Sequence, residues 1–167
     1  MDIYNPIGQV VGIYIKDKEK GPVRSLVEGF FEKDRGLLGD IHSKGGNRQV
    51  SIFTLEGYNE ILSSNMEGLC SGRFYENIRV KGLDLDKIKI GSILKIGESI
   101  QEVTEIGKSC FPECNLVKEG RSCPLSSQVI FTKVIKGGRI GVGNMVIMDR
   151  LHNYICSIIQ QIPKGVI

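Results

Sequence analysis

The chain has 167 residues, with 22 lysines and arginines against 19 aspartates and glutamates and a formal charge of +3. This length predicts one domain that folds on its own core without a structural metal or disulfide. The small charge gives no sign of a nucleic-acid partner. Hydrophobic residues make up 41% and charged residues 25% of the chain, which excludes a disordered protein. No apolar run reaches the roughly 18 residues of a membrane span, and the N-terminus lacks a signal-peptide pattern.

Short strands dominate the elements predicted in the first half of the chain. Residues 10–15 and 49–53 are β-branched or apolar runs that predict strands. Residues 34–47 contain four glycines and predict a long loop of the kind that carries functional groups. Residues 55–64 have apolar side chains at helical spacing and predict a helix, with Thr54 as its N-cap.

The second half of the chain also predicts strands. Residues 87–106 read as short strands interrupted by glycine-containing turns. Residues 129–135 and 139–148 flank Lys136-Gly137-Gly138, and this pattern predicts a hairpin whose tight turn uses the positive φ angles that glycine allows. Together with the 21 glycines, these elements predict a mainly β fold, a barrel or a sandwich with helical additions.

The last segment has an apolar stripe at helical spacing. It predicts an amphipathic C-terminal helix, so the chain divides into a domain at 1–150 and a helical extension at 151–167. We expect the helix to pack on its own barrel, and contact with a second copy in a homodimer is the alternative. The stripe consists of Leu151, Tyr154, Ile155, Ile158, Ile159 and Ile162.

An odd number of cysteines without an export signal favours a reducing, cytoplasmic location and argues against a disulfide framework. Three of the five lie within fourteen residues and predict a site. The cysteines are Cys70, Cys110, Cys114, Cys123 and Cys156.

Three interpretations of this cluster remain open. Cys110, Cys114 and Cys123 could form a structural zinc site, with the fourth ligand from His42, His152 or Cys156. One thiolate could instead bind a thiophilic transition metal that is held mainly by an organic cofactor. The third interpretation treats the cysteines as inert small hydrophobic residues, which suits the isolated Cys70 and Cys156.

Asp40 and His42 place a carboxylate and an imidazole two residues apart, a spacing suited to hydrogen bonding or proton transfer near pH 7. The spacing alone favours a simpler arrangement, an aspartate that caps the turn and an exposed histidine. Gly107-Lys108-Ser109 is similar to the end of a P-loop, but Glu102 stands where that motif requires glycine, which excludes it. Basic side chains that could contact phosphate are Arg48, Arg73, Arg79, Lys108, Lys118 and Arg121.

Four segments in this order give the chain a resemblance to the MOSC domain, named for the C-terminal domain of molybdenum cofactor sulfurases, and in particular to its small stand-alone bacterial members. The resemblance covers about residues 8–148. Its segments are Gly36-x-x-Gly39-Asp40-x-His42 with Arg48-Gln49-Val50-Ser51; Gly72-Arg73-Phe74-x-Glu76-Asn77-Ile78 with Gly82-Leu83; residues 89–108; and Cys110 to Cys123 followed by residues 131–143.

The resemblance implies a MOSC-like β-barrel, here with one internal helix and a C-terminal helix, that binds a molybdenum or tungsten pterin cofactor (molybdopterin) and uses no pyridoxal phosphate. It implies that the thiolate of Cys114 binds the metal and carries the chemistry, with Cys110 and then Cys123 as the next choices. The remaining implied cofactor contacts are Asp40, His42, Arg48, Arg73, Asn77 and Lys108.

With this resemblance we expect carriage of the cofactor or its sulfur, and reduction of N-hydroxylated compounds is the alternative. Its expected partners are the cofactor and either a redox protein or a molybdoenzyme, with no nucleic acid and no membrane. The chain departs from the family pattern at Gly45-Gly46-Asn47, where an aromatic residue or a second histidine is common. It departs again after Cys123, where Pro124-Leu125-Ser126-Ser127 replaces the usual Met-Pro and charged pair.

Overall fold

Seven strands close into a barrel in the computed structural model of the chain, which describes residues 6–65, 68–70 and 72–149. The long first strand closes the ring by pairing with the last one. Only one neighbouring pair is parallel, the fifth and sixth strands of the chain. Around the barrel the order is β11 (Met145–Met148), β7 (Ile93–Ile96), β8 (Ser99–Ile106), β9 (Val129–Lys136), β5 (Val50–Thr54), β6 (Ile78–Lys81) and β1 (Pro6–Ile15).

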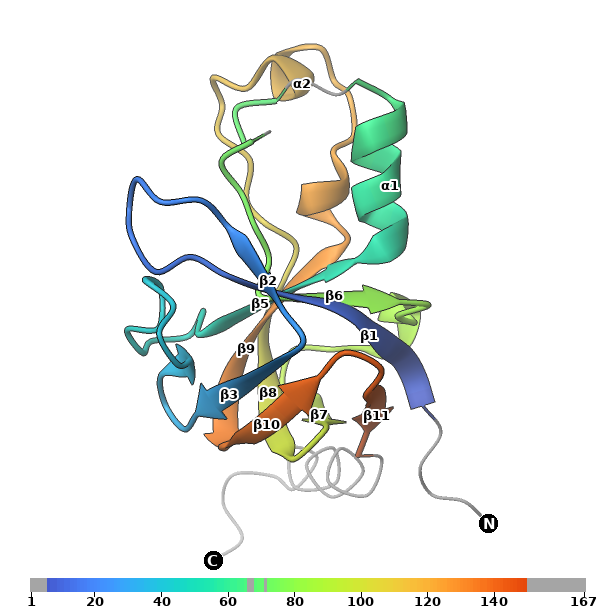
Figure 1. Cartoon of the computed structure of the whole chain (residues 1–167). Coiled ribbons are helices and arrows are strands. Elements are labelled where there is room, and N and C mark those ends of the chain that lie inside the picture. Colours follow the sequence, from blue (N-terminus) through green and yellow to red (C-terminus); the bar gives the residue numbers. More distant parts are fainter. Residues whose placement is uncertain (1–5, 66–67, 71, 150–167) are drawn as a thin grey trace, which may run out of the picture.

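Smaller elements extend this barrel. Strand β2 (Arg24–Leu26) pairs with the end of β1, and a second sheet has the order β10 (Gly138–Gly141), β3 (Glu28–Glu32), β4 (Gly36–Leu37). Figure 1 shows helices α1 and α2 together at the top of the view, and β3 and β10 near its bottom. The helices are α1 (Leu55–Ser63) and α2 (Asn115–Lys118), with 3-10 turns η1 (Leu85–Lys87) and η2 (Pro124–Ser126).

The predicted helix after β5 is confirmed, including its cap. The side chain of Thr54 accepts a hydrogen bond from the backbone N–H of Gly57 at 2.9 Å, which satisfies one of the free donors of the first turn. One apolar face of α1 covers a small second core at this end of the barrel, made of Phe53, Leu125, Val129 and Phe131. The helix therefore anchors the end of the barrel from which the long loops leave.

The main core fills the barrel itself. Buried residues alternate with partly exposed ones along most of β8, whereas residues 129–132 of β9 are all buried. Val103 and Val134 are completely buried. The predicted strands at 10–15 and 49–53 are confirmed as β1 and β5. The predicted loop at 34–47 is confirmed as well, apart from the two-residue strand β4 inside it. The observed fold of the described residues is therefore a mainly β barrel with two short helices, α2 being one more than the single internal helix predicted.

The predicted hairpin across Gly137-Gly138 is wrong. Strand β9 pairs with β5 and β8, whereas β10 leaves the barrel and pairs with β3. Neither glycine has the positive φ of a tight primed turn. Close packing is what requires them, because a Cβ on Gly138 would stand 2.6 Å from the Cβ of Glu98, and one on Gly137 would stand 2.9 Å from the carbonyl oxygen of Phe31.

Two predictions concern parts of the chain that the structure does not describe. The C-terminal helix at 151–162 lies outside the described residues, and so do its contacts with the barrel or with a second copy.

Within the described part of the chain, no helix is long and apolar enough to cross a membrane.

Candidate functional site

A large cavity of about 640 Å³ lies beside the barrel, where the long loops meet strands β5 and β9. Three loop segments supply most of its wall: residues 42–48, residues 69–70 with 72–77, and residues 108–113. These loop segments overlap all four sequence segments that carry the resemblance described above. The lining residues are His42, Arg48, Ser51, Leu69, Cys70, Arg73, Phe74, Tyr75, Asn77, Lys108, Phe111, Glu113 and Phe131.

Asn77 fixes the second of these segments to the barrel. Its side-chain oxygen accepts a hydrogen bond from the backbone N–H of Ser51 at 3.1 Å, and its own N–H donates to the Ser51 carbonyl at 3.0 Å. Asn77 is buried, and it immediately precedes β6, which runs parallel to β5. An asparagine at this point therefore fixes the spacing of the two strands as well as lining the cavity.

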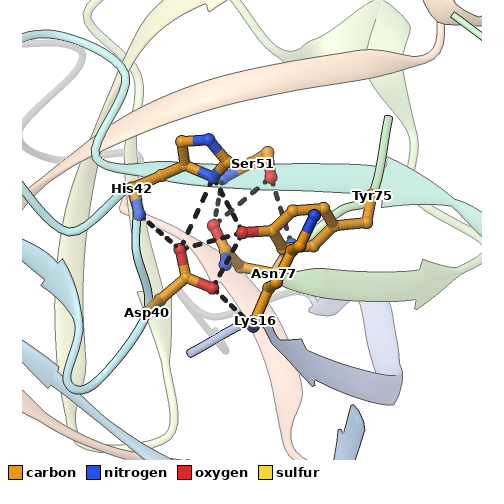
Figure 2. A network of polar contacts seen from close by, with 6 residues as sticks. All are labelled: Lys16, Asp40, His42, Ser51, Tyr75 and Asn77. Carbon is orange, nitrogen blue, oxygen red and sulfur yellow. Dashed lines mark hydrogen bonds and ion pairs between the residues drawn. The ribbon is translucent and has the colours of Figure 1, made fainter. Parts of the chain in front are cut away.

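Asp40 and His42 adopt the simpler of the two arrangements. The buried carboxylate of Asp40 accepts hydrogen bonds from the backbone N–H of Lys16 at 3.0 Å and of His42 at 2.9 Å, so it caps the loop. The imidazole of His42 is exposed and lines the large cavity. Tyr75 joins the two, because its hydroxyl lies 3.1 Å from both Asp40 oxygens and 2.7 Å from Nδ1 of His42 (Figure 2).

Three of the six basic residues proposed for phosphate contact line the cavity: Arg48, Arg73 and Lys108. Arg48 stacks over the ring of Phe131 at 4.6 Å and forms an ion pair with Glu105, which lowers the pKa of that carboxyl group. Within the described ranges, the guanidinium group of Arg73 has no hydrogen-bond or ion-pair partner. A cluster of cations with at least one uncommitted guanidinium group suits a phosphate ester.

The other three basic residues point to structural or surface roles. Arg79 lies between the rings of Tyr14 and Tyr58 and pairs with Glu76, so it is part of the packing beside α1. Lys118 is exposed on α2, and Arg121 is exposed and paired with Glu119. None of these three lines the large cavity.

The thiols gather around a second, small cavity of about 20 Å³. Cys110, Cys114 and Cys123 line this small cavity and not the large one. Cys114 is only 7% exposed, and the segment at Gly68 packs against its sulfur. Cys70 lines both cavities, and its sulfur lies 3.0 Å from the ammonium group of Lys108. The two cavities therefore share a wall made partly of Cys70.

The Cys114 thiol has the most anion-stabilising surroundings. A hydrogen bond from the backbone N–H of Leu69 lowers its pKa, assisted by the N–H groups of Leu116 and Val117 at the start of α2. At Cys123 burial has the opposite effect and raises the pKa of the thiol. Of these two thiols, Cys114 is therefore the one whose surroundings favour the thiolate.

This difference can be measured by alkylation. When the folded chain reacts with iodoacetamide across a pH series and the peptides are quantified by mass spectrometry, we expect a lower pH midpoint for Cys114 than for Cys123. Only thiolates react, so the midpoint reports the thiol pKa while the plateau rate reports access. A midpoint for Cys114 at or above that of Cys123 would contradict the assignment.

The predicted zinc site is not assembled in the described part of the chain. No group of three or more histidine, cysteine, aspartate or glutamate side chains among residues 6–65, 68–70 and 72–149 is arranged to hold a metal ion. Two of the three residues considered as a fourth ligand, His152 and Cys156, lie outside those ranges.

Sequence reasoning missed two residues of the site. Cys70 is isolated in the sequence, but it lies beside Lys108 and lines a cavity with three other thiols. Its position two residues before the Gly72-Arg73 motif was the one feature of the sequence that could have marked Cys70 as a site residue. Tyr75 occupies the unspecified position of that same motif, and only the folded chain shows that it meets Asp40 and His42.

Comparisons with known proteins give similarity at the level of structure. No family model matches the chain, and no curated protein matches it. The crystal structure of the YuaD protein from Bacillus subtilis is similar with a TM-score of 0.63 and 18% identity, over 87% of this chain and 97% of that one. The crystal structure of YiiM from Escherichia coli has a TM-score of 0.55 and 15% identity, over 84% of this chain and 69% of that one. The crystal structure of YiiM from Geobacillus stearothermophilus has a TM-score of 0.51 and 15% identity, over 87% of this chain and 74% of that one. The chain shares the fold of these proteins.

Proposed function

We propose that the chain is a MOSC-type protein that binds a molybdenum or tungsten pterin cofactor in the large cavity and acts in carriage of the cofactor or its sulfur through a cysteine thiolate. The observation that carries the proposal is the cavity itself. It brings His42, Arg48, Arg73, Asn77 and Lys108 to one cavity, although the sequence marks them in separate motifs. The fold shared with YuaD and YiiM supports the same assignment.

The residues present fit such a cofactor in size and charge. A volume of about 640 Å³ lies in the range of roughly 300–1,000 Å³ that is usual for cofactor sites. The rings of Phe74, Phe111 and Phe131 offer apolar walls for a flat heterocycle. Arg48 and Arg73 offer guanidinium groups to a phosphate. The Arg48–Glu105 pair is partly exposed and therefore weak enough for phosphate to displace the carboxylate.

The thiols near the large cavity suit the metal of such a cofactor. A soft thiolate is the side chain that suits molybdenum, and the cofactor would supply redox chemistry or transferable sulfur when bound. Cys114 is the proposed ligand, as the resemblance implies, and backbone N–H groups stabilise its anion. Cys114 lines the small cavity and not the large one, so this assignment requires the metal to reach the small cavity past Cys70. Cys70 is the second choice, because it lies in the wall of the large cavity beside the Lys108 cation.

The test is a metal and pterin analysis of protein made in a molybdate-fed host and purified without oxygen. We expect stoichiometric molybdenum or tungsten together with the fluorescence of oxidised pterin. Cys114→Ala should lose most of the metal and keep pterin, because the phosphate contacts remain. Lys118→Ala is the control, since that side chain is exposed on α2 and lines neither cavity, and it should not affect loading.

Each other outcome has a definite meaning. Metal lost in Cys70→Ala but retained in Cys114→Ala assigns the ligand to Cys70. The proposal is overturned if the wild type contains no pterin although the same host loads a known molybdoenzyme in parallel. If the wild type instead contains one zinc ion per chain, the chain is a zinc-stabilised binding module. With the cofactor present, one added sulfur atom on the thiol supports carriage. Turnover of an N-hydroxylated base with a reductant would instead make the chain a reductase.

A further inference from the structure

We propose that Asp40 and Tyr75 hold the ring of His42 in its Nδ1–H form, so that Nε2 of His42 is the hydrogen-bond acceptor and base of the large cavity. Figure 2 shows the three side chains together, with Tyr75 between the other two. The proposal goes beyond cofactor binding and does not depend on which ligand the cavity takes. It concerns any ligand that presents an N–H or O–H group to this wall.

The argument starts at Asp40. Each of its oxygens accepts a backbone N–H, Oδ2 from Lys16 and Oδ1 from His42, and these donors cannot act as acceptors. The carboxylate is buried and therefore fixed in place by the loop it caps. As an ionised group it can only accept hydrogen bonds, so any third partner has to be a donor.

Tyr75 is that third partner, and it has a single proton to give. Its hydroxyl lies 3.1 Å from both oxygens of Asp40. If the proton pointed at His42 instead, the phenol oxygen would face the carboxylate with nothing between them. Burial, and then the charge of Asp40, raise the pKa of the Tyr75 hydroxyl, so the group stays protonated. Tyr75 therefore donates to Asp40, and its oxygen is left as an acceptor.

The acceptor oxygen of Tyr75 faces Nδ1 of His42 at 2.7 Å. A hydrogen bond of that length between these atoms requires a proton on Nδ1. A neutral imidazole has one N–H, so Nε2 then carries the lone pair. The ring is exposed and lines the large cavity, where a ligand can reach it.

The arrangement also supports proton transfer. When an N–H or O–H of a ligand gives its proton to Nε2, the ligand keeps the electron pair and the ring becomes a cation. Asp40 then lies 3.8 Å from Nδ1 and stabilises that cation directly and through Tyr75. The other charged groups of this wall are Arg48, Arg73, Lys108 and Glu113. Tyr75 and Asp40 are positioning residues, and His42 is the group that touches the ligand.

Nitrogen NMR of the histidine rings tests the proposal on the ligand-free chain. The chain has two histidines, His42 and His152, and His42→Gln assigns the signals. Above the pH at which the rings lose their charge, we expect His42 to show a protonated Nδ1 and an unprotonated Nε2. An imidazole in water prefers the opposite form. His152 serves as an internal comparison.

Tyr75→Phe removes the bridging hydroxyl and should return His42 to the solvent-like form. Tyr58→Phe is the matched control, because that ring packs on Arg79 and not on the histidine, and it should leave the His42 signals unchanged. A wild-type spectrum with the proton on Nε2 overturns the proposal, and so does a Tyr75→Phe spectrum identical to the wild type. If Tyr75→Phe does not fold, the wild-type spectrum alone decides. None of these outcomes depends on cofactor loading.

Discussion

Glu76→Ala is expected to lower the free energy of unfolding by about 3 kcal/mol, at the low end of the roughly 3–5 kcal/mol that breaking a buried ion pair costs. Glu76 and Arg79 have only 6% and 13% of their side-chain surface exposed, so the variant leaves a guanidinium group in the interior without its carboxylate. The rings of Tyr14 and Tyr58, at 4.6 and 3.4 Å from that group, offset part of the loss.

The matched control for this variant is Glu28→Ala. Glu28 pairs with Arg139 at 3.1 Å, but both side chains are at least half exposed, and an exposed pair contributes at most about 1 kcal/mol. Urea unfolding followed by circular dichroism measures both variants, with the slope m checked for constancy. Equal losses in the two variants would show that the Glu76–Arg79 pair is not a buried pair in solution.

Gly107→Ala is expected to destabilise the chain by about 2–5 kcal/mol, through two effects at one position. Gly107 has a φ of +77°, where a Cβ costs roughly 1–2 kcal/mol. That Cβ would also stand 2.0 Å from the carbonyl oxygen of Ser126, and overpacking adds roughly 1–3 kcal/mol. Because backbone cannot give way like a flexible side chain, the loop that carries Lys108 has to move.

A second glycine separates the two effects in Gly107→Ala. Gly82 has a φ of +65°, and a Cβ at this position would meet no other part of the chain within 4 Å, so Gly82→Ala should show only the backbone cost. Urea unfolding gives the two stabilities. The rate of Cys70 alkylation reports the loop, since Lys108 lies 3.0 Å from that sulfur only when the loop is in place. A Gly107→Ala variant as stable as Gly82→Ala would contradict the close contact with Ser126.

Much of the candidate site could be predicted from the sequence. His42, Arg48, Arg73, Asn77 and Lys108 lie in short motifs, and all five line one cavity. The same patterns did not show that the three clustered cysteines line a different, smaller cavity. Spacing along the chain tells which residues share a loop, but the side of a packed segment on which each sulfur lies depends on contacts between distant segments.

Cys114 shows this limit most clearly. The sequence places it within a cluster of thiols, and the structure places it against the segment at Gly68, with an N–H of Leu69 on its sulfur. The two segments are more than forty residues apart in the chain. Tyr75 is a similar case, because a single tyrosine in the sequence does not indicate a site residue. Its role becomes evident only in the folded chain, where its hydroxyl contacts Asp40 and His42.

Strands β1 and β5, the capped helix α1 and the loops that carry polar groups could be predicted from the order of residues alone. These features depend on side-chain periodicity and turn chemistry within a few neighbouring residues. The pairing of β10 with β3 could be seen only in the folded chain, and so could the position of Cys70 rather than Cys114 at the large cavity. Both depend on how closely distant pieces of backbone approach each other, and that distance is set by packing of the whole barrel.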